Sequence, residues 1–213
     1  MIMPLSGNYR LGDVSVVVWS ITENEDELLS QLPLEYVTVV QSMKSERRRM
    51  EWLAVRMLLS HLFGREERII YDEAGKPTLV KGEYNISVSH TTGYAVLAYS
   101  DKPFGIDVEL LDRDLLPLAR KLLGDAEMAL LDKWCVNELL LARWCACESL
   151  FKLVGDLGGT FKDNVIARLS SLSDSGTFEV LLSGVTSFYG ERFVANYRRC
   201  GDVLLVACTP VEE

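Results

Sequence analysis

The stretch Phe104-Gly-Ile-Asp-Val-Glu109 determines how the rest of the chain is interpreted. Ile106 and Val108 are β-branched residues, which favour a strand. Because successive strand side chains point to opposite faces, Asp107 and Glu109 share one face. Two carboxylates on one face repel each other unless a positive charge lies between them, and Mg²⁺ held by oxygen ligands would supply that charge. The alternative is a solvated edge strand whose outer face is acidic.

The composition is that of a folded protein. The chain has 213 residues, of which 48% are hydrophobic and 25% are charged, and this length suits one large domain or two small ones. The net charge of −9 argues against a general nucleic-acid binder, which needs a basic excess. We therefore expect no nucleic-acid partner, although residues 44–49 form a local basic patch.

Cysteine usage and the lack of targeting signals indicate the compartment. Five cysteines without a C-x-x-C pair, and two histidines, predict neither a disulfide framework nor a structural zinc site. No apolar run reaches the length of a membrane span, and the first residues lack the basic-then-apolar order of a signal peptide. We expect a reduced, cytoplasmic protein with no membrane partner.

Helix and strand signals alternate along the chain. The clearest is a helix over 45–63, where apolar residues recur at three- and four-residue intervals and Gly64 follows as a stop. The acidic strand is expected to extend an antiparallel sheet with the two strands before it. The other predicted elements are strands at 13–19, 66–71, 84–90, 94–99, 164–169, 177–182, 191–197 and 202–209, and helices at 22–31, 114–124, 125–134 and 137–154, the last three capped by Asp114, Asp125 and Asn137, while 34–43 fits either strand or helix.

Helices followed by strands occur in each half of the chain. This order predicts an α+β protein with two similar halves, residues 1–103 and 104–213, divided near Pro103. No residue-level repeat demonstrates a duplication.

A second group of charged residues lies on the helix predicted to end at Val154. Glu148 and Lys152 are four residues apart and are therefore neighbours on one helix face. A surface pair of this kind is common and contributes roughly a few tenths of a kcal/mol. Trp144 and Phe151, however, make this region apolar, and an ion pair in an apolar wall is costly to desolvate without further partners. A metal ion beside the pair would be such a partner.

Four motifs together resemble the 4′-phosphopantetheinyl transferase superfamily. They are Gly75-Lys-Pro77, Ser87-Val-Ser-His90, Gly105-Ile-Asp-Val-Glu109 and Trp144-x-x-x-Glu-Ser-x-x-Lys152. The likeness extends over about residues 44 to 155, and the motifs follow one another in the family's order and spacing. That spacing is most similar to the monomeric, double-length members that act on carrier proteins.

The resemblance implies two similar α/β halves related by a pseudo-twofold axis, with the active site in the cleft between them. It also implies an activity, in which the phosphopantetheine arm of coenzyme A moves to a serine of an apo acyl or peptidyl carrier protein and 3′,5′-ADP is released. Asp107, Glu109 and Glu148 match the positions that hold Mg²⁺, and Lys152 matches the lysine that contacts the phosphates. Glu148, or a metal-bound water, is the candidate base for the serine proton.

The same resemblance implies contacts with coenzyme A in the first half of the chain. The 3′-phosphate is expected near His90 and the adenine near the Gly75–Pro77 turn. Basic side chains of residues 44–56 are expected to reach the 3′-phosphate, although a solvated helix face is the simpler interpretation of such residues. The candidate coenzyme A contacts are Lys44, Arg48, Arg56, Gly75, Lys76, Pro77, Ser89 and His90.

One position departs from the family's pattern. A lysine usually precedes the helix glutamate, whereas this chain has Cys147. The missing cation would weaken coenzyme A binding or slow transfer, so one alternative is a catalytically weak or silent relative that binds coenzyme A or a carrier protein. Another metal-dependent phosphoryl enzyme and a simple interaction module are further alternatives. Cys147 is not expected to be a nucleophile, because no histidine stands at a meaningful spacing from it.

Overall fold

The structure is a computed structural model that describes residues 5–64, 67–124, 128, 136–157, 159–183 and 192–211. The chain divides into two compact units, each described separately below. Unit 1 comprises Met1–Arg10 and Ser15–Asp101, and unit 2 comprises Leu11–Val14 and Lys102–Glu213.

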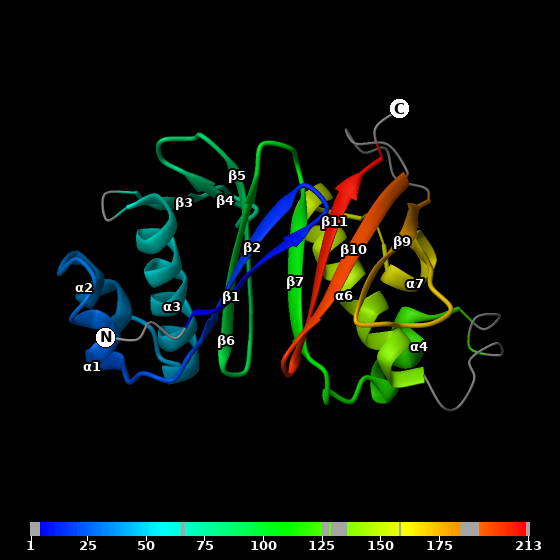
Figure 1. The fold of residues 1–213 in the computed structure, drawn as a ribbon, viewed down its shortest axis with the longest axis horizontal. Coiled ribbons are helices and arrows are strands. Elements are labelled where there is room, and N and C mark those ends of the chain that lie inside the picture. Colours follow the sequence, from blue (N-terminus) through cyan, green and yellow to red (C-terminus); the bar gives the residue numbers. More distant parts are fainter. Residues whose placement is uncertain are drawn as a thin grey trace. The chain divides into compact units, whose positions relative to one another are not determined.

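The elements follow the chain in an order that is similar in both units (Figure 1). Up to residue 101 they are β1 (Leu5–Leu11), β2 (Val14–Ser20), α1 (Glu25–Leu29), α2 (Glu35–Gln41), α3 (Glu46–Phe63), β3 (Ile69–Tyr71), β4 (Pro77–Leu79), β5 (Asn85–Thr91) and β6 (Tyr94–Ser100). From residue 102 they are β7 (Gly105–Leu110), the 3₁₀ turn η1 (Leu116–Leu118), α4 (Ala119–Leu122), α6 (Val136–Val154), α7 (Phe161–Asn164), β8 (Val165–Arg168), β9 (Ser175–Leu182), β10 (Arg192–Cys200) and β11 (Val203–Pro210).

The two sheets share one strand topology. The order is β1-β2-β6-β5-β4-β3 in unit 1 and β7-β11-β10-β9-β8 in unit 2. In each unit a first strand, β2 or β7, precedes the helices, and four antiparallel strands follow them. The last of these four, β6 or β11, returns to pair antiparallel with the first strand. Apart from β1, the second sheet therefore repeats the first strand for strand. The predicted α+β class is confirmed, and the pseudo-twofold relation of the halves stays a prediction.

In unit 1 the long helix α3 packs on one side of the sheet (Figure 1). The Ser45 hydroxyl accepts a hydrogen bond from the Arg48 amide and begins the helix, and Gly64, with a φ of 88°, ends it. The helix predicted over 45–63 is thus confirmed. Its buried face joins β2 and β6 in one core, which includes Trp19, Leu53, Leu58, Ala95 and Leu97.

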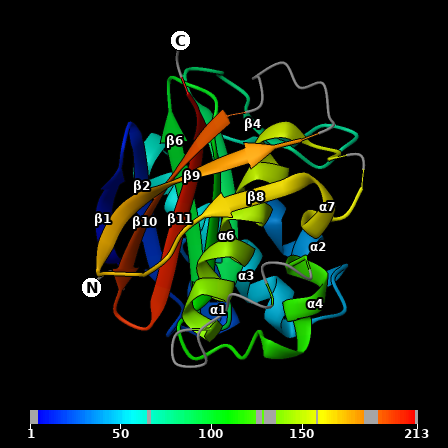
Figure 2. The same cartoon turned by 90° about the vertical axis from the view of Figure 1, so that its right-hand side faces the viewer.

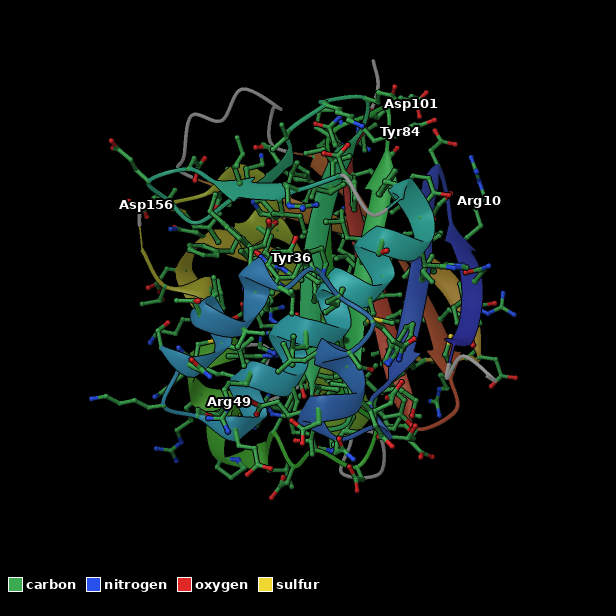
Figure 3. All side chains as sticks on the ribbon, turned by 90° about the vertical axis from the view of Figure 1, so that its left-hand side faces the viewer. Arg10, Tyr36, Arg49, Tyr84, Asp101 and Asp156 are labelled. Carbon is green, nitrogen blue, oxygen red and sulfur yellow. The ribbon has the colours of Figure 1, made fainter. Side chains whose placement is uncertain are left out.

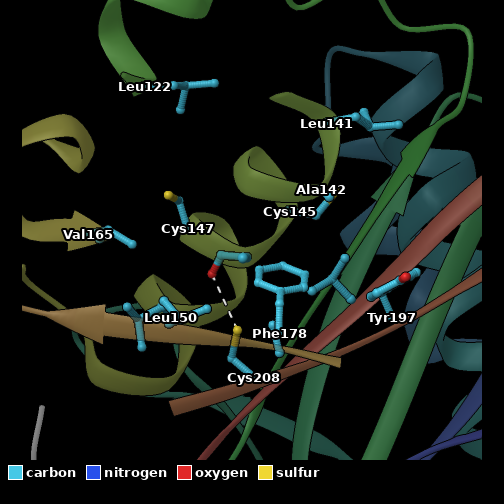
Figure 4. Packing of buried hydrophobic residues seen from close by; sticks show 14 of the residues in the cluster. Leu122, Leu141, Ala142, Cys145, Cys147, Leu150, Val165, Phe178, Tyr197 and Cys208 are labelled. Carbon is cyan, nitrogen blue, oxygen red and sulfur yellow. Dashed lines mark hydrogen bonds between the residues drawn. The ribbon is translucent and has the colours of Figure 1, made fainter. Parts of the chain in front are cut away.

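In unit 2 the helix α6 lies against the sheet beside β7 and β11 (Figure 2). Figure 4 shows the core that forms between them, with Cys147 and Leu150 from the helix near Phe178 and Cys208 from the strands. Fully burying a leucine or phenylalanine side chain contributes about 2 kcal/mol. This packing therefore fixes α6 against the sheet more firmly than any single polar contact.

Two predictions about the pairing of elements were wrong. The acidic strand β7 does not continue the first sheet but pairs antiparallel with β11 in the second, with Asp107 opposite Val206. Asn137 does not cap α6: its side chain accepts a hydrogen bond from the Leu115 amide and donates one to the Arg113 carbonyl. Both differences involve partners that are distant in sequence, which local patterns do not specify.

Other predictions differ in extent. The strand predicted over 66–71 is confined to Ile69–Tyr71, the open stretch 34–43 forms the helix α2, and β1 was not predicted. The helix predicted at 125–134 lies outside the described residues apart from residue 128. In the part of the chain that the structure describes, no helix has both the length and the apolar character needed to cross a membrane.

Candidate active site

The acidic face of β7 is covered rather than solvated. Asp107 is only 6% exposed, and the side chain of Glu109 is 13% exposed. The helix α6 lies over the face that carries Asp107 and Glu109, while Ile106 and Val108 are fully buried on the opposite face. The alternative of a solvated acidic strand is therefore wrong.

Gly105 allows α6 to approach β7 closely. A Cβ atom at Gly105 would lie 1.9 Å from the carbonyl oxygen of Ser149, so no residue larger than glycine fits without moving the helix. Ser149 Oγ donates a hydrogen bond to the Val206 carbonyl at 2.8 Å, and Cys208 Sγ donates one to the Ala146 carbonyl at 3.5 Å (Figure 4). These contacts tie the same stretch of helix to β7 and β11.

Lys152 joins the helix to the acidic strand. Its Nζ donates to the Ile106 carbonyl and to Asp107 Oδ1, both at 2.8 Å. The Asp107 side chain is 9% exposed and the Lys152 side chain 27% exposed, so water screens this ion pair only in part. The lysine that the sequence placed beside Glu148 on the helix is therefore also the partner of a strand carboxylate.

Glu148 lies within the electrostatic reach of both strand carboxylates. Burial raises the pKa of Glu148, and the negative charge of Asp107 raises it further. The positive charges of Lys152 and Arg113 oppose this rise, while Glu109 adds to it. The structure thus brings together all four residues predicted for the metal and the phosphates: Asp107, Glu109, Glu148 and Lys152.

Arg113 is a member of this group that the sequence did not reveal. Its Nη1 donates to Glu109 Oε1 in an ion pair, and its guanidinium carbon lies 5.1 Å from the centre of the Trp144 ring. Trp144 in turn makes an edge-to-face contact with Phe161. The sequence does show a basic residue four positions after Glu109. It does not show that the loop after β7 turns back and brings Arg113 to the strand.

The donor set fits Mg²⁺ in chemistry, because three carboxylates offer the hard oxygen ligands that this ion prefers. Within the described ranges, however, no group of three or more histidine, cysteine, aspartate or glutamate side chains is already arranged to hold a metal. Lys152 and Arg113 instead make ion pairs with Asp107 and Glu109. A divalent ion would therefore have to displace these basic groups from the carboxylates.

The burial of Cys147 explains why no lysine stands at this position. The side chain is fully buried in the unit 2 core (Figure 4), so a lysine at this position would place its charge in an apolar environment. The neighbouring Cys145 is also fully buried, and burial together with the negative charge of Asp107 raises the pKa of its thiol. A thiol held in the protonated form is a poor nucleophile, so Cys145 is not suited to thiolate catalysis.

In unit 1, His90 is held by a buried glutamate that sequence reasoning missed. His90 Nδ1 lies 3.2 Å from Glu51 Oε2, and Arg47 Nε donates to Glu51 Oε1 at 2.7 Å. Glu51 is 4% exposed although it is charged. It stands three residues before Ala54 and seven before Leu58, on the apolar face of α3. A charged residue on that face was the signal that could have identified it.

The turn at Gly75–Pro77 is closed by Asp72. Asp72 Oδ1 accepts a hydrogen bond from the Lys76 amide at 2.8 Å, and Gly75 has a φ of 82°, which favours glycine. Pro77 begins β4. The turn therefore holds Lys76 in a defined backbone position. His90 lies within β5, in agreement with the strand predicted over 84–90.

The remaining basic candidates, on α3 and just before it, differ in burial. Lys44 and Arg48 are exposed, whereas Arg56 is 6% exposed, with its guanidinium 3.8 Å from the centre of the Trp52 ring. Burial lowers the pKa of Arg56. Arg49, labelled in Figure 3, makes an ion pair with Glu25. Ser89, another of the candidate coenzyme A contacts, is buried. The solvated-face interpretation therefore holds for Lys44 and Arg48 but not for Arg56.

The chain matches no model of a known protein family, and no curated protein matches its sequence. Any assignment of function therefore depends on the motifs and on the geometry described above.

Proposed function

We propose that the chain is an Mg²⁺-dependent 4′-phosphopantetheinyl transferase, which moves the phosphopantetheine group of coenzyme A to a serine of an apo acyl or peptidyl carrier protein. The observation that supports this most is the grouping of Asp107, Glu109 and Glu148 with Lys152 at the contact of β7 and α6. The repeated strand topology also agrees with the two similar halves that the resemblance implies.

The reaction balances without any further reactant. The serine oxygen attacks the phosphorus that bears the pantetheine arm and forms a new phosphorus–oxygen bond. The bond from that phosphorus to the bridging oxygen of the pyrophosphate breaks, and the bridging oxygen leaves with 3′,5′-ADP. The serine proton passes to a base. Because negative charge grows on the leaving phosphate, the site must supply positive charge close to it.

The site residues divide these tasks. Bound Mg²⁺ would neutralise charge on the pyrophosphate oxygens, held by Asp107, Glu109 and Glu148. Lys152, fixed by the Ile106 carbonyl, would donate to a phosphate oxygen once it is displaced from Asp107. Glu148 is one candidate to receive the serine proton, because its carboxylate lies beside the strand carboxylates and Lys152. A metal-bound water is the other candidate base.

The remaining assignments are part of the same proposal. Coenzyme A is the second substrate, with contacts to its nucleotide from the Gly75–Pro77 turn, from Ser89 and His90, and from the basic residues Lys44, Arg48 and Arg56. The protein acts as a cytoplasmic monomer whose macromolecular partner is the carrier protein. No nucleic acid and no membrane take part.

A silent relative that binds coenzyme A without transfer is the second candidate. Two observations favour it: Cys147 is buried where the family usually has a lysine, and both strand carboxylates already have basic partners. In this case coenzyme A or a carrier protein would bind, but the serine would not be modified.

Mass spectrometry of an apo carrier protein incubated with the chain, coenzyme A and Mg²⁺ tests the proposal. We expect the carrier to gain one phosphopantetheine group, and we expect Glu109→Gln to abolish the gain. Glu179→Gln is the matched control, because Glu179 is a glutamate of the same unit that pairs with Arg168 and Arg192 instead. Coenzyme A binding without any gain of mass by several carriers would favour the silent relative. Cleavage of coenzyme A or a phosphodiester by water would favour another metal-dependent phosphoryl enzyme.

A further inference from the structure

The loop after β7 holds Arg113 in a fixed place. The Arg113 amide donates to the Leu110 carbonyl at 3.1 Å, and the Arg113 carbonyl accepts from Asn137 Nδ2 at 2.9 Å. The Leu115 amide donates to Asn137 Oδ1 at 2.8 Å. Asn137, at the start of α6, therefore ties the loop backbone at Arg113 and two residues after it, and the arginine side chain begins from a defined point.

The side chain of Arg113 is placed as firmly as its backbone. Its guanidinium makes an ion pair with Glu109 and lies over the Trp144 ring, which stands one helical turn before Glu148 on α6. The Arg113 side chain is 35% exposed, so its charge remains accessible from solvent. A guanidinium offers five N–H donors in a planar fork, and one carboxylate oxygen uses only part of that set.

The balance of acidic and basic side chains at the site suggests a further role for Arg113. Three carboxylates face two basic groups, Lys152 and Arg113, and the buried Cys147 supplies no cation where the family that the motifs resemble usually has a lysine. If Mg²⁺ were bound by the carboxylates, both basic groups would lose their carboxylate partners, although Lys152 would keep its hydrogen bond to the Ile106 carbonyl. Their released donors would then be available to the pyrophosphate of coenzyme A.

We infer that Arg113 is a second phosphate-binding cation of the site, which donates to the pyrophosphate together with Lys152 once Mg²⁺ holds Glu109. It supplies from the β7 loop the positive charge that position 147 cannot supply. This inference rests on the proposed function, since it assumes that coenzyme A is the ligand.

The test separates a phosphate contact from a merely structural role. Arg113→Gln removes the cation and also releases Glu109 from its ion pair. If Arg113 contacts phosphate, the variant binds Mn²⁺ alone as tightly as the unaltered protein or more tightly, but it binds coenzyme A in the presence of Mg²⁺ at least about tenfold more weakly. If Arg113 only orients Glu109, the affinities for Mn²⁺ and for coenzyme A fall together. Electron paramagnetic resonance reports Mn²⁺ binding, and calorimetry reports coenzyme A binding.

Two further variants complete the experiment. Arg113→Lys keeps the charge but loses the planar fork over Trp144, and we expect it to restore part of the coenzyme A affinity; it also serves if Arg113→Gln does not fold. Arg192→Gln is the matched control, because Arg192 pairs with Glu179 on another strand, and it should leave both affinities unchanged.

The outcomes distinguish the two levels of the proposal. Unchanged coenzyme A affinity in Arg113→Gln, or a joint loss of metal and coenzyme A binding, overturns the role of Arg113 and leaves the transferase proposal standing. A complete lack of coenzyme A binding by the unaltered protein with Mg²⁺ overturns the proposed function, and the role of Arg113 falls with it.

Discussion

Glu148 is a carboxylate whose ionisation opposes folding. Burial and the charge of Asp107 raise the pKa of Glu148 above its ordinary value. Below the ordinary carboxyl pKa the group is protonated in both the folded and the unfolded chain, so it has no effect on stability there. As the pH rises from the ordinary carboxyl pKa through the raised pKa of the folded state, Glu148 ionises more readily in the unfolded chain than in the folded chain. The folded state therefore loses stability over this pH range.

Glu148→Gln stays neutral at every pH. We therefore expect the stability of this variant, relative to the unaltered protein, to increase as the pH rises from about 4 to about 7. One pKa unit corresponds to about 1.4 kcal/mol, and partial solvent contact at Glu148 makes the gain smaller than that figure implies. Urea unfolding in EDTA at the two pH values measures the difference. The measured quantity is the unfolding free energy of the variant minus that of the unaltered protein. A smaller value at neutral pH than at acid pH would contradict this account.

Lys152 has both a structural and a chemical role. Lys152→Met removes the donor to the Ile106 carbonyl and leaves the buried Asp107 carboxylate without this partner, so we expect a loss of about 1–3 kcal/mol in unfolding free energy. We also expect transfer to slow by about 10²–10³-fold, as when a donor to a developing charge is removed. Unfolding curves and initial transfer rates test the two effects separately. A variant that transfers at the normal rate would remove Lys152 from the chemistry.

The contact between α6 and β7 depends on Gly105. A methyl group there would meet the Ser149 carbonyl at 1.9 Å. Neither the backbone of β7 nor that of α6 can move away without breaking backbone hydrogen bonds of the sheet or the helix. We expect Gly105→Ala to cost about 2–3 kcal/mol in unfolding free energy and to separate Lys152 from Asp107, with a large loss of activity.

The control for this variant is Gly176→Ala on β9, where the added methyl would meet the end of the Tyr197 side chain. Because a side chain can move aside, we expect a much smaller loss of stability. Thermal unfolding of both variants provides the comparison. Equal losses would show that the helix does not depend on the close approach at Gly105.

Sequence patterns predicted those elements whose determinants lie close together in the chain. The helix over 45–63 followed from apolar spacing, Ser45 and Gly64, all of which act within one helix. The pairing of β7 with β11 and the bonds of Asn137 to the Arg113 loop join distant segments, and no local periodicity specifies them. The motif residues Asp107, Glu109, Glu148 and Lys152 were predicted together, whereas Glu51 and Arg113 act through tertiary contacts and were missed.

Across the entire chain, two units repeat one strand order although no residue-level repeat was found. Strand order depends on which apolar faces must be covered, and many sequences satisfy that requirement. This explains why the sequence predicted similar halves from the order of helices and strands but could not specify the crossover of β2 to β6 or of β7 to β11.

The net charge of −9 leads to a prediction about how fast the protein meets a carrier protein. If the proposed carrier partner has an acidic helix beside its serine, as the resemblance implies, long-range charge should repel rather than steer it. We expect the second-order rate constant for carrier modification to rise or stay constant as salt increases toward physiological strength, because screening reduces repulsion. A steep fall with salt would instead indicate a local basic docking surface. Stopped-time mass spectrometry at several salt concentrations measures it.

All these proposals assume that carboxylates from β7 and α6 exchange their basic partners for one divalent ion that binds a pyrophosphate. Calorimetric titration of coenzyme A into the protein, in Mg²⁺ and then in EDTA, measures this exchange. We predict binding in Mg²⁺ that weakens by at least about 10²-fold in EDTA, and by a similar factor in Asp107→Asn with Mg²⁺ present. Coenzyme A binding of equal strength with and without Mg²⁺, or binding that survives Asp107→Asn unchanged, would contradict the account.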